Sequence, residues 1–542
     1  MCRNYNLPFF TPLLFILLCL TVLVHKVARA EDPEKSPGKE VEAPPEIEMA
    51  NIGFKMLSVT LRDAIALAVS NNFDVEFARV SPRIARGKII IEKSKFDPTL
   101  RFAYRVREYE RPSDNTLEVA FTAEERGQGK VKQAFNDERI YSSVLESKVQ
   151  SGARLELEFG MLRQFIPTFP NQTLDPDWRN FMEFRVVQPF LKDFGIFFNR
   201  SKINMAKNER KISDAELKQA LVETINATQT AYWNLVRAIE HYRVTQKSLD
   251  VANELNKIND NRVEAGLLEE VELLSSSAAV AAREEDLVRA ESDVRRAEDE
   301  LKRVLNVSQD NLLSDATVMP LDSPPFEEKA VQLGESIKTA LENRDDLVKE
   351  HLQVENSKIE VKRKRNQMLP RLDGQLGIRY EGLAGNPEDS LDSLFSEKFQ
   401  DDFYSLSLEV PIGLREGRHE YANAKYKKRQ AEIMLSKLEQ RIVVEVKDAV
   451  RQIVTNRKRV DATRKAKKLS HKRWQIEKEK FDSGLATTFE VLTAEKELAL
   501  AERNEISAII DYNISLDNIE AKKGTILEKY KIPIEKTSEI KK

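Results

Sequence analysis

The chain has little cysteine, glycine and proline, and it has no excess of charge of one sign. Its 542 residues include two cysteines, 18 glycines and 20 prolines. The two cysteines are Cys2 and Cys19, so a disulfide-stabilised scaffold is excluded for the rest of the chain. The scarcity of glycine and proline allows long uninterrupted elements. A formal net charge of −3 lacks the one-sign excess of a nucleic-acid-binding surface.

Signatures of catalysis and metal binding are also missing. The five histidines are scattered, and none pairs with another at the spacing of metal ligands. No phosphate-binding loop, nucleophile elbow or dinucleotide fingerprint is present. The basic run KRKR at residues 362–365 lies on an expected helix, where a solvated face is the simpler explanation. We therefore expect no enzyme, no cofactor, no metal site and no nucleic-acid partner.

The N-terminus has the features of an export signal over residues 1–30. Arg3 is followed by an apolar run of twelve residues at 13–24 and by an A-x-A cleavage motif, Ala28-Arg29-Ala30. The run is shorter than the roughly 20 residues of a membrane span, although an uncleaved anchor remains the alternative. Cys19 follows Leu18 rather than a small residue, which disfavours lipid attachment.

The chain contains an internal duplication. AYWNLVRA around Ala231 recurs as AVRQIVTN around Ala449, and VEAGLLEEVELL around Gly266 recurs as FDSGLATTFEVLT around Gly484. Both pairs are 218 positions apart. Two landmarks in the same register indicate two structural repeats with similar long elements.

Each repeat also contains a pair of segments in which apolar and polar residues alternate. The first pair begins after Pro98 and ends at Pro189, and the second begins after Pro370 and ends at Pro411. The alternation predicts strands with one apolar face, which either packs on helices or faces lipid in a barrel. The apolar set includes Leu100, Phe102, Tyr104, Val106, Leu372, Leu376, Ile378 and Tyr380. The opposite face would carry Arg101, Arg105, Arg107, Asp373, Gln375 and Arg379.

The first repeat has about 50 more residues between its strands than the second. Part of this insertion, around Ser151-Gly152, has the pattern of another hairpin, and residues 167–178 read as a loop. The sequence leaves open whether residues 110–180 add barrel strands or form an external loop.

Very long helices follow the strands. No proline occurs at about 195–262 or 417–482, and helices of roughly 65 residues would be about 100 Å long. Helices of this length need coiled-coil partners. Heptad-like seams support this prediction: Val280, Leu287, Val294 and Leu301 in one repeat, and Ile442, Val446, Ala449 and Ile453 in the other.

These patterns predict a mainly α fold with β strands, internally duplicated. The expected order is a signal peptide (1–30), an acidic Pro-rich lead-in (31–55), a first repeat (56–307), a linker (308–335), a second repeat (336–530) and a tail (531–542). The first repeat has a hairpin at about 98–189 and a helix pair at about 195–305 that turns at 266. The second has a hairpin at about 370–411 and a helix pair at about 417–528 that turns at 484.

The chain resembles the TolC family of outer-membrane efflux and secretion channels. The resemblance rests on LRDAIALAVSNN, VQPFLKDFG and SGLATTFEVLTAEKELALAERN, and on the order and duplication of the segments. It implies a homotrimer in which each chain gives four strands to one shared transmembrane β-barrel, while the helices form a coiled-coil α-helical barrel across the periplasm. Two hairpins cannot close a barrel alone, so oligomerisation is required.

The resemblance also implies acidic residues where the tunnel closes. Glu490 matches the first family acid, whereas Thr493 departs from the pattern at a second one. Glu272 is the first-repeat equivalent of Glu490, and Glu269 and Glu270 lie beside it. We expect a ring of carboxylates at a narrow mouth, the alternative being ordinary exposed helix residues.

The two helix turns are the expected contact for a periplasmic adaptor protein. Gly266-Leu267 and Gly484-Leu485 lie in the two most similar stretches, where each helix pair must reverse. The expected function is a passive export conduit in the outer membrane of a diderm bacterium. It would extend into the periplasm, contact outer-membrane lipid and work with the adaptor and an inner-membrane transporter. The alternative is a periplasmic coiled-coil scaffold or adaptor without a barrel.

Overall fold

The computed structural model describes residues 56–113, 132–165, 173–306 and 317–532. Within these ranges the chain is mainly helical, with one six-stranded sheet and one two-stranded sheet. The expected signal peptide with Ala28 and Ala30, the lead-in at 31–55 and the tail beyond residue 532 lie outside the described residues.

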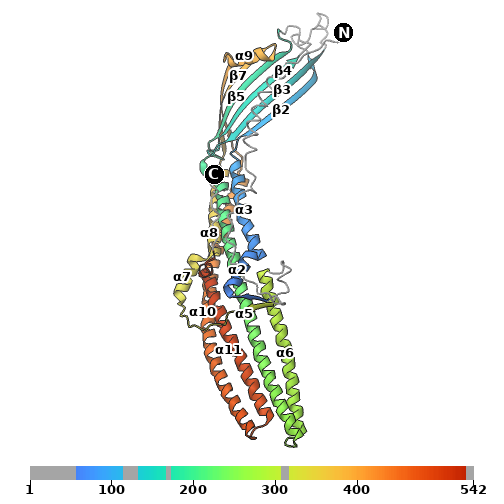
Figure 1. The fold of residues 1–542 in the computed structure, drawn as a ribbon. Helices are drawn as coiled ribbons and strands as arrows, with labels where there is room; N and C mark the ends of the chain where they lie inside the picture. The colour runs from blue at the N-terminus through green and yellow to red at the C-terminus, as the bar shows by residue number, and fades with distance from the viewer. Residues whose placement is uncertain (1–55, 114–131, 166–172, 307–316, 533–542) are drawn as a thin grey trace, which may run out of the picture. The chain divides into compact units, whose positions relative to one another are not determined.

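Four long helices form two antiparallel pairs, as the duplication predicted (Figure 1). The helices are α5 (Ile196–Glu264), α6 (Glu270–Leu305), α10 (Arg415–Asp482) and α11 (Thr488–Lys523). The first pair has 69 and 36 residues, and the second has 68 and 36. The repeat spacing therefore preserves the length of each helix and the position of its turn.

The shorter helices repeat as well. In the first half, α2 (Leu61–Asn71) and α3 (Phe73–Ser94) precede the sheet, and in the second half α7 (Leu333–Asn343) and α8 (Asp345–Gln367) do so. Helices α3 and α8 both pack against α5, and α8 also packs against α10. Two further helices are short: α9 (Pro387–Phe395) and α12 (Ile526–Lys529).

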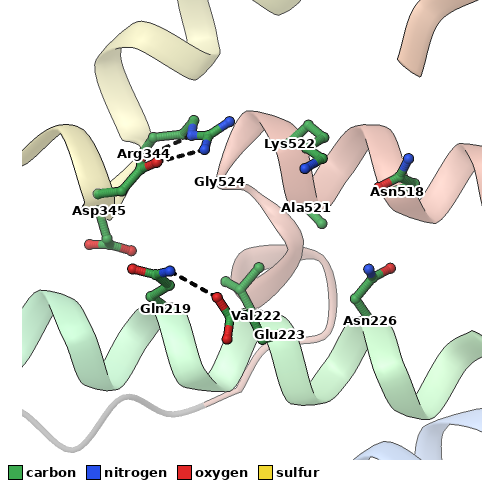
Figure 2. A pocket seen from close by; sticks show the side chains of 11 residues that line it. Gln219, Val222, Glu223, Asn226, Arg344, Asp345, Asn518, Ala521, Lys522 and Gly524 are labelled. Atoms are coloured by element: carbon green, nitrogen blue, oxygen red, sulfur yellow. Dashed lines mark hydrogen bonds and ion pairs between the residues drawn. The ribbon is translucent and has the colours of Figure 1, made fainter. Parts of the chain in front are cut away.

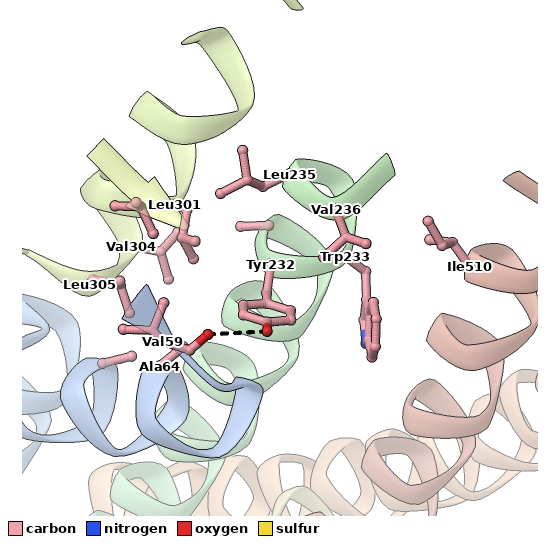
Figure 3. Close-up of a cluster of buried hydrophobic side chains, with 13 residues drawn as sticks. Val59, Ala64, Tyr232, Trp233, Leu235, Val236, Leu301, Val304, Leu305 and Ile510 are labelled. Carbon is pink, nitrogen blue, oxygen red and sulfur yellow. Dashed lines mark hydrogen bonds between the residues drawn. The ribbon is translucent and has the colours of Figure 1, made fainter. Parts of the chain in front are cut away.

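The heptad seam predicted in α10 is buried. Ile442, Val446, Ala449 and Ile453 belong to a cluster that also contains Tyr512 of α11. A second cluster joins α2, α5, α6 and α11 around Tyr232 and Trp233 (Figure 3). Each fully buried large aliphatic side chain contributes about 1.5–3 kcal/mol, so these seams stabilise the long helices more than helix propensity does.

The segment at 308–335 is more than the linker that its prolines predicted. Strand β6 (Thr317–Pro320) pairs in parallel with β1 (Met56–Val59), at the start of the first repeat. The Tyr232 hydroxyl fixes this small sheet, since it donates to the Val59 carbonyl at 3.2 Å and lies 2.8 Å from a carboxylate oxygen of Asp322. Residues 307–316 are outside the described part of the chain.

The large sheet is antiparallel throughout, in the order β2-β3-β4-β5-β7-β8 (Figure 1). Its strands are β2 (Thr99–Ser113), β3 (Lys132–Lys148), β4 (Arg154–Phe165), β5 (Asp177–Pro189), β7 (Arg371–Ala384) and β8 (Gln400–Glu409). The second-repeat hairpin, β7 with β8, confirms the prediction for 370–411.

The first-repeat hairpin differs from the expectation. Strands β2 and β5 are not neighbours, because the hairpin β3–β4 of the insertion lies between them. The Ser151-Gly152 turn of that hairpin was predicted correctly. The count of four strands per chain was wrong: the described sheet has six, since β3 and β4 continue the hydrogen-bonded ladder without a break.

Candidate functional site: the sheet faces and the paired helix turns

One face of the six-stranded sheet carries a row of exposed apolar residues. Residues that are Cα partners in neighbouring strands have side chains on the same face. One such row crosses five strands, and its members are 40–47% exposed in the single chain. The row consists of Leu100, Leu145, Leu157, Phe184 and Ile378. A continuous exposed apolar row indicates a surface that water does not normally cover.

The opposite face is polar. The pairing register places Arg101 in one row with Glu183 and Arg379, so these side chains share a face. The guanidinium of Arg379 lies 3.5 Å from a Glu183 carboxylate oxygen and 2.7 Å from one of Glu381. The alternation of the strands puts the other predicted residues on this same face: Arg105, Arg107, Asp373 and Gln375.

The two helix turns have the same backbone geometry. Gly266 has φ 67° and Gly484 has φ 74°, which are left-handed conformations. After each glycine a Schellman motif closes the helix: the Leu267 amide donates to the Arg262 carbonyl at 2.8 Å, and the Leu485 amide donates to the Lys480 carbonyl at 2.8 Å. Both leucine side chains are largely exposed, at 77% and 80%.

The helix that follows each turn begins differently in the two halves. Thr487 and Glu490 form a capping box at the start of α11: the Glu490 amide donates to the Thr487 hydroxyl at 3.3 Å, and the Thr487 amide donates to the Glu490 carboxylate at 2.8 Å. Hydrogen bonds from Thr487 hold the pKa of Glu490 below its ordinary value. In the first half Glu269 is the N-cap of α6 and makes no side-chain capping bond, and Glu270 and Glu272 occupy the first turn.

The two turns are tied together within the chain. The Thr488 hydroxyl donates to the Asn259 side-chain carbonyl at 3.0 Å, and both residues are buried. The Arg262 guanidinium lies 4.6 Å from the ring centroid of Phe481. The candidate acids of both halves therefore lie at the same end of the helices, in the first turns of α6 and α11.

A buried carboxylate above the turns is not among the predicted residues. Glu495 of α11 is 6% exposed, accepts a hydrogen bond from the Ser248 hydroxyl at 2.8 Å and lies 3.9 Å from the Arg283 guanidinium. Burial raises the pKa of this carboxyl. A sequence signal exists, because Glu495 falls on the helical stripe between the buried residues Val491 and Leu498.

A pocket lies where α5, the start of α8 and the end of α11 meet (Figure 2). Its charged residues are already paired: Arg344 binds Asp346 at 2.6 Å and Glu445 at 2.8 Å, and Asp345 lies 3.3 Å from Lys218. The Gln219 side-chain amide donates a hydrogen bond to the Glu223 carboxylate, one turn further along α5, at 2.8 Å. These contacts make the pocket a structural junction between the repeats.

No group of three or more His, Cys, Asp or Glu side chains in the described ranges is arranged to hold a metal ion. Among the helices of those ranges, none combines the length and the apolar character needed to cross a membrane.

A sheet with an exposed apolar row, joined to two antiparallel helix pairs whose longer members have 69 and 68 residues, is the architecture of an outer-membrane channel subunit. Residues 186–307 and 336–524 match the outer membrane efflux protein family, and together they make up more than half of the chain. The chain therefore belongs to the outer membrane efflux protein family. Its members are transport channels rather than enzymes. No curated protein matches the sequence.

Solved structures share this fold at low sequence identity. The CmeC outer membrane channel of Campylobacter jejuni is 17% identical, with a TM-score of 0.60 and 86% of each chain covered. VceC of Vibrio cholerae is 17% identical, with a TM-score of 0.60 over 86% of this chain and 96% of that one. The open-state MtrE channel of Neisseria gonorrhoeae is 16% identical, with a TM-score of 0.58 over 91% and 98%.

Proposed function

We propose that three copies of this chain form a conduit through the outer membrane and across the periplasm. The conduit exports solutes that an inner-membrane pump delivers through a periplasmic adaptor. The observation that carries this proposal is the exposed apolar row from Leu100 to Ile378, opposite the charged face with Arg379 and Glu183. Apolar residues outside and charged residues inside are the arrangement of a membrane barrel with a water-filled bore.

The edges of the sheet require further copies. Strands β2 and β8 each have one neighbour in the described sheet. Within hydrocarbon an unpaired strand edge leaves backbone groups without hydrogen-bond partners, at several kcal/mol each. Because the sheet is antiparallel and has an even number of strands, β8 of one copy can pair antiparallel with β2 of the next. Such head-to-tail pairing forms a ring when the rotation from one copy to the next closes after three copies.

Helix α3 offers a second surface for a neighbouring copy. Five large apolar residues on it are exposed and recur at intervals of four, three, four and seven positions: Phe73, Phe77, Val80, Ile84 and Ile91. These intervals place them on one stripe of the helix, as in a coiled-coil seam. A helix from the adjacent copy would cover this stripe.

The paired turns are the proposed adaptor contact. Leu267 and Leu485 protrude from identical backbone motifs at the same end of the helices. We expect Leu485→Asp and Gly484→Trp to reduce adaptor binding at least tenfold in a titration with the purified adaptor. Leu469→Asp, an exposed leucine elsewhere on α10, is the control. Unchanged binding by the first two variants would exclude this contact.

The acidic residues near the turns are proposed to favour cations at the mouth. In a trimer, Glu272 and Glu490 supply up to six carboxylates, and the hydrogen bonds that lower the pKa of Glu490 favour its ionised form. Glu490→Gln should lower the cation preference measured from reversal potentials under a salt gradient. Glu269→Gln and Glu270→Gln test the adjacent positions in the same way.

A periplasmic scaffold without a barrel is the alternative function. It predicts a water-soluble protein, whereas the conduit predicts a trimer that fractionates with the outer membrane and conducts ions in a planar bilayer. Single-channel recording of the purified full-length chain separates the two. Absence of conductance together with a soluble species would reject the conduit.

A further inference from the structure

We propose that this trimer closes an 18-stranded barrel, with an outlet wide enough for large hydrated solutes. The inference rests on the proposed trimeric conduit and deepens it. Its basis is the hairpin β3–β4, which belongs to the insertion of the first repeat and supplies two of the six described strands. Three copies with six strands each give about one and a half times the strands of three copies with four.

The hairpin is a full member of the sheet. Its register is continuous with β2 from Thr99 to Ser113 and with β5 from Arg154 to Gln164. Near the Ser151-Gly152 turn its side chains continue both faces of the sheet, whereas Asp137, Arg139 and Arg163 form ion pairs on the apolar side further from the turn. Leu145 and Leu157 continue the exposed apolar row, and Ser142 and Glu156 lie on the charged face. A hairpin that formed an external loop would have no need of one apolar face and one charged face in line with those of the neighbouring strands.

The tip of the hairpin is fastened where the sheet meets the helices. The Gly195 amide, at the N-cap of α5, donates to the Ser151 carbonyl at 2.9 Å. Gly152 is buried with φ 102°, and a Cβ there would lie 2.6 Å from the Asp193 carbonyl oxygen. The turn therefore fits tightly against the β5–α5 connection, which places the hairpin in the wall at the rim nearest the helices.

Barrel diameter grows roughly linearly with strand number, so 18 strands give a diameter about 1.5 times that of 12. Barrels of 16–18 strands leave an aqueous channel. The hairpin also adds charge to the inner face: Glu156 lies 3.8 Å from Arg185, and Arg185 also binds Glu183. A wide bore lined by ion pairs suits bulky hydrated solutes better than compact apolar ones.

Single cysteines test where the hairpin lies. The chain's own cysteines, Cys2 and Cys19, are both in the predicted signal peptide, so an added cysteine would be unique in the mature chain. Purified mature protein in phospholipid vesicles is treated with a membrane-impermeant maleimide. Leu145→Cys and Leu157→Cys should be protected by lipid, and Ser142→Cys should be labelled.

The second repeat supplies matched controls. Leu376→Cys on the apolar face of β7 should be protected, and Ser405→Cys on the charged face of β8 should be labelled. Labelling of Leu145→Cys and Leu157→Cys while Leu376→Cys stays protected would overturn the 18-stranded barrel and leave the conduit intact. Labelling of Leu376→Cys as well would overturn the conduit itself.

The width is measured separately by polymer exclusion. Neutral polyethylene glycols of increasing size are added to one side of the channel at a time, and the change in conductance reports their entry. Polymers added from the sheet side should enter up to a radius about 1.5 times that of a 12-stranded barrel. A cut-off at the 12-stranded radius from that side would contradict the wide outlet.

Discussion

The two helix turns share their glycine geometry and differ in the residues that cap the next helix. Gly266 and Gly484 adopt the same left-handed conformation. In each Schellman motif the glycine amide and the following leucine amide donate to carbonyl groups in the last turn of the helix. Yet Thr487 caps α11 in a capping box, whereas Glu269 makes no side-chain cap on α6. Reversing the chain requires a specific backbone conformation, while capping contributes only a modest stability that one copy of a duplication can lose.

The buried residues of the long helices α5 and α10 also differ between the two repeats. Ile442 and Val446 are buried in α10, and the positions 218 residues earlier are Thr224 and Thr228, which are also buried. The Thr228 hydroxyl donates to the Thr224 carbonyl at 2.8 Å, which satisfies its hydrogen-bonding need inside the helix. At these two positions the second repeat is therefore stabilised more by apolar packing than the first repeat is.

The largest expected effect tests this difference in packing. Ile442→Ala should lower the stability of the full-length protein by about 2–5 kcal/mol, because it leaves a cavity in a fully buried seam. Thr224→Ala should cost less, about 1 kcal/mol, since it deletes fewer buried atoms. Thermal unfolding followed by circular dichroism measures both. Equal losses would show that the two halves are packed alike.

The turns should respond equally to substitution. Gly266→Ala and Gly484→Ala each place a Cβ in a left-handed conformation, at a cost of about 1–2 kcal/mol. Neither Cβ would meet another atom within 4 Å, so only the backbone strain differs from the original protein. Matching shifts in the unfolding midpoint are expected. A shift at one turn alone would mean that the shared geometry does not control stability.

The sequence predicted the helices and turns well, because their signals are local. Proline-free runs define α5 and α10, and a glycine marks each reversal. Other features depend on distant partners. The strands β1 and β6 have four residues each, too few for a detectable periodicity, and Tyr232 and Asp322 meet where the two strands pair.

The hairpin of the insertion and the buried Glu495 could likewise not be placed from local sequence patterns alone. The Ser151-Gly152 turn could be predicted from its local pattern, but no local pattern tells whether a hairpin joins its neighbours in a sheet. Glu495 was missed because a single glutamate in an Ala- and Leu-rich helix looks exposed until Ser248 and Arg283 are found beside it. Placing them required tertiary structure.

Glu495 also distinguishes the halves, because the position 218 residues earlier is Ser277, which is exposed. Its pKa is raised in the folded chain, chiefly by burial, from an unfolded value of about 4.3. Its contribution to stability is therefore greatest below pH 4 or so and is lost as the pH rises through the folded pKa. Glu495→Gln should unfold at a higher temperature than the original protein at pH 7, and this advantage should shrink towards pH 4. A difference that does not vary with pH would contradict the assigned burial effect.

The smallest effect is expected from a substitution that makes the two turns alike. Glu269→Thr places a hydroxyl at the N-cap of α6, three residues before Glu272, and so recreates the Thr487–Glu490 arrangement. A new capping box should stabilise the first helix pair by a few tenths to about 1 kcal/mol. The reverse change, Thr487→Ala, should destabilise the second pair by about 1 kcal/mol. Hydrogen exchange of the first-turn amides of α6 and α11 measures each pair separately. Unchanged hydrogen exchange in α6 of the Glu269→Thr variant would show that the missing cap does not account for the difference between the two turns.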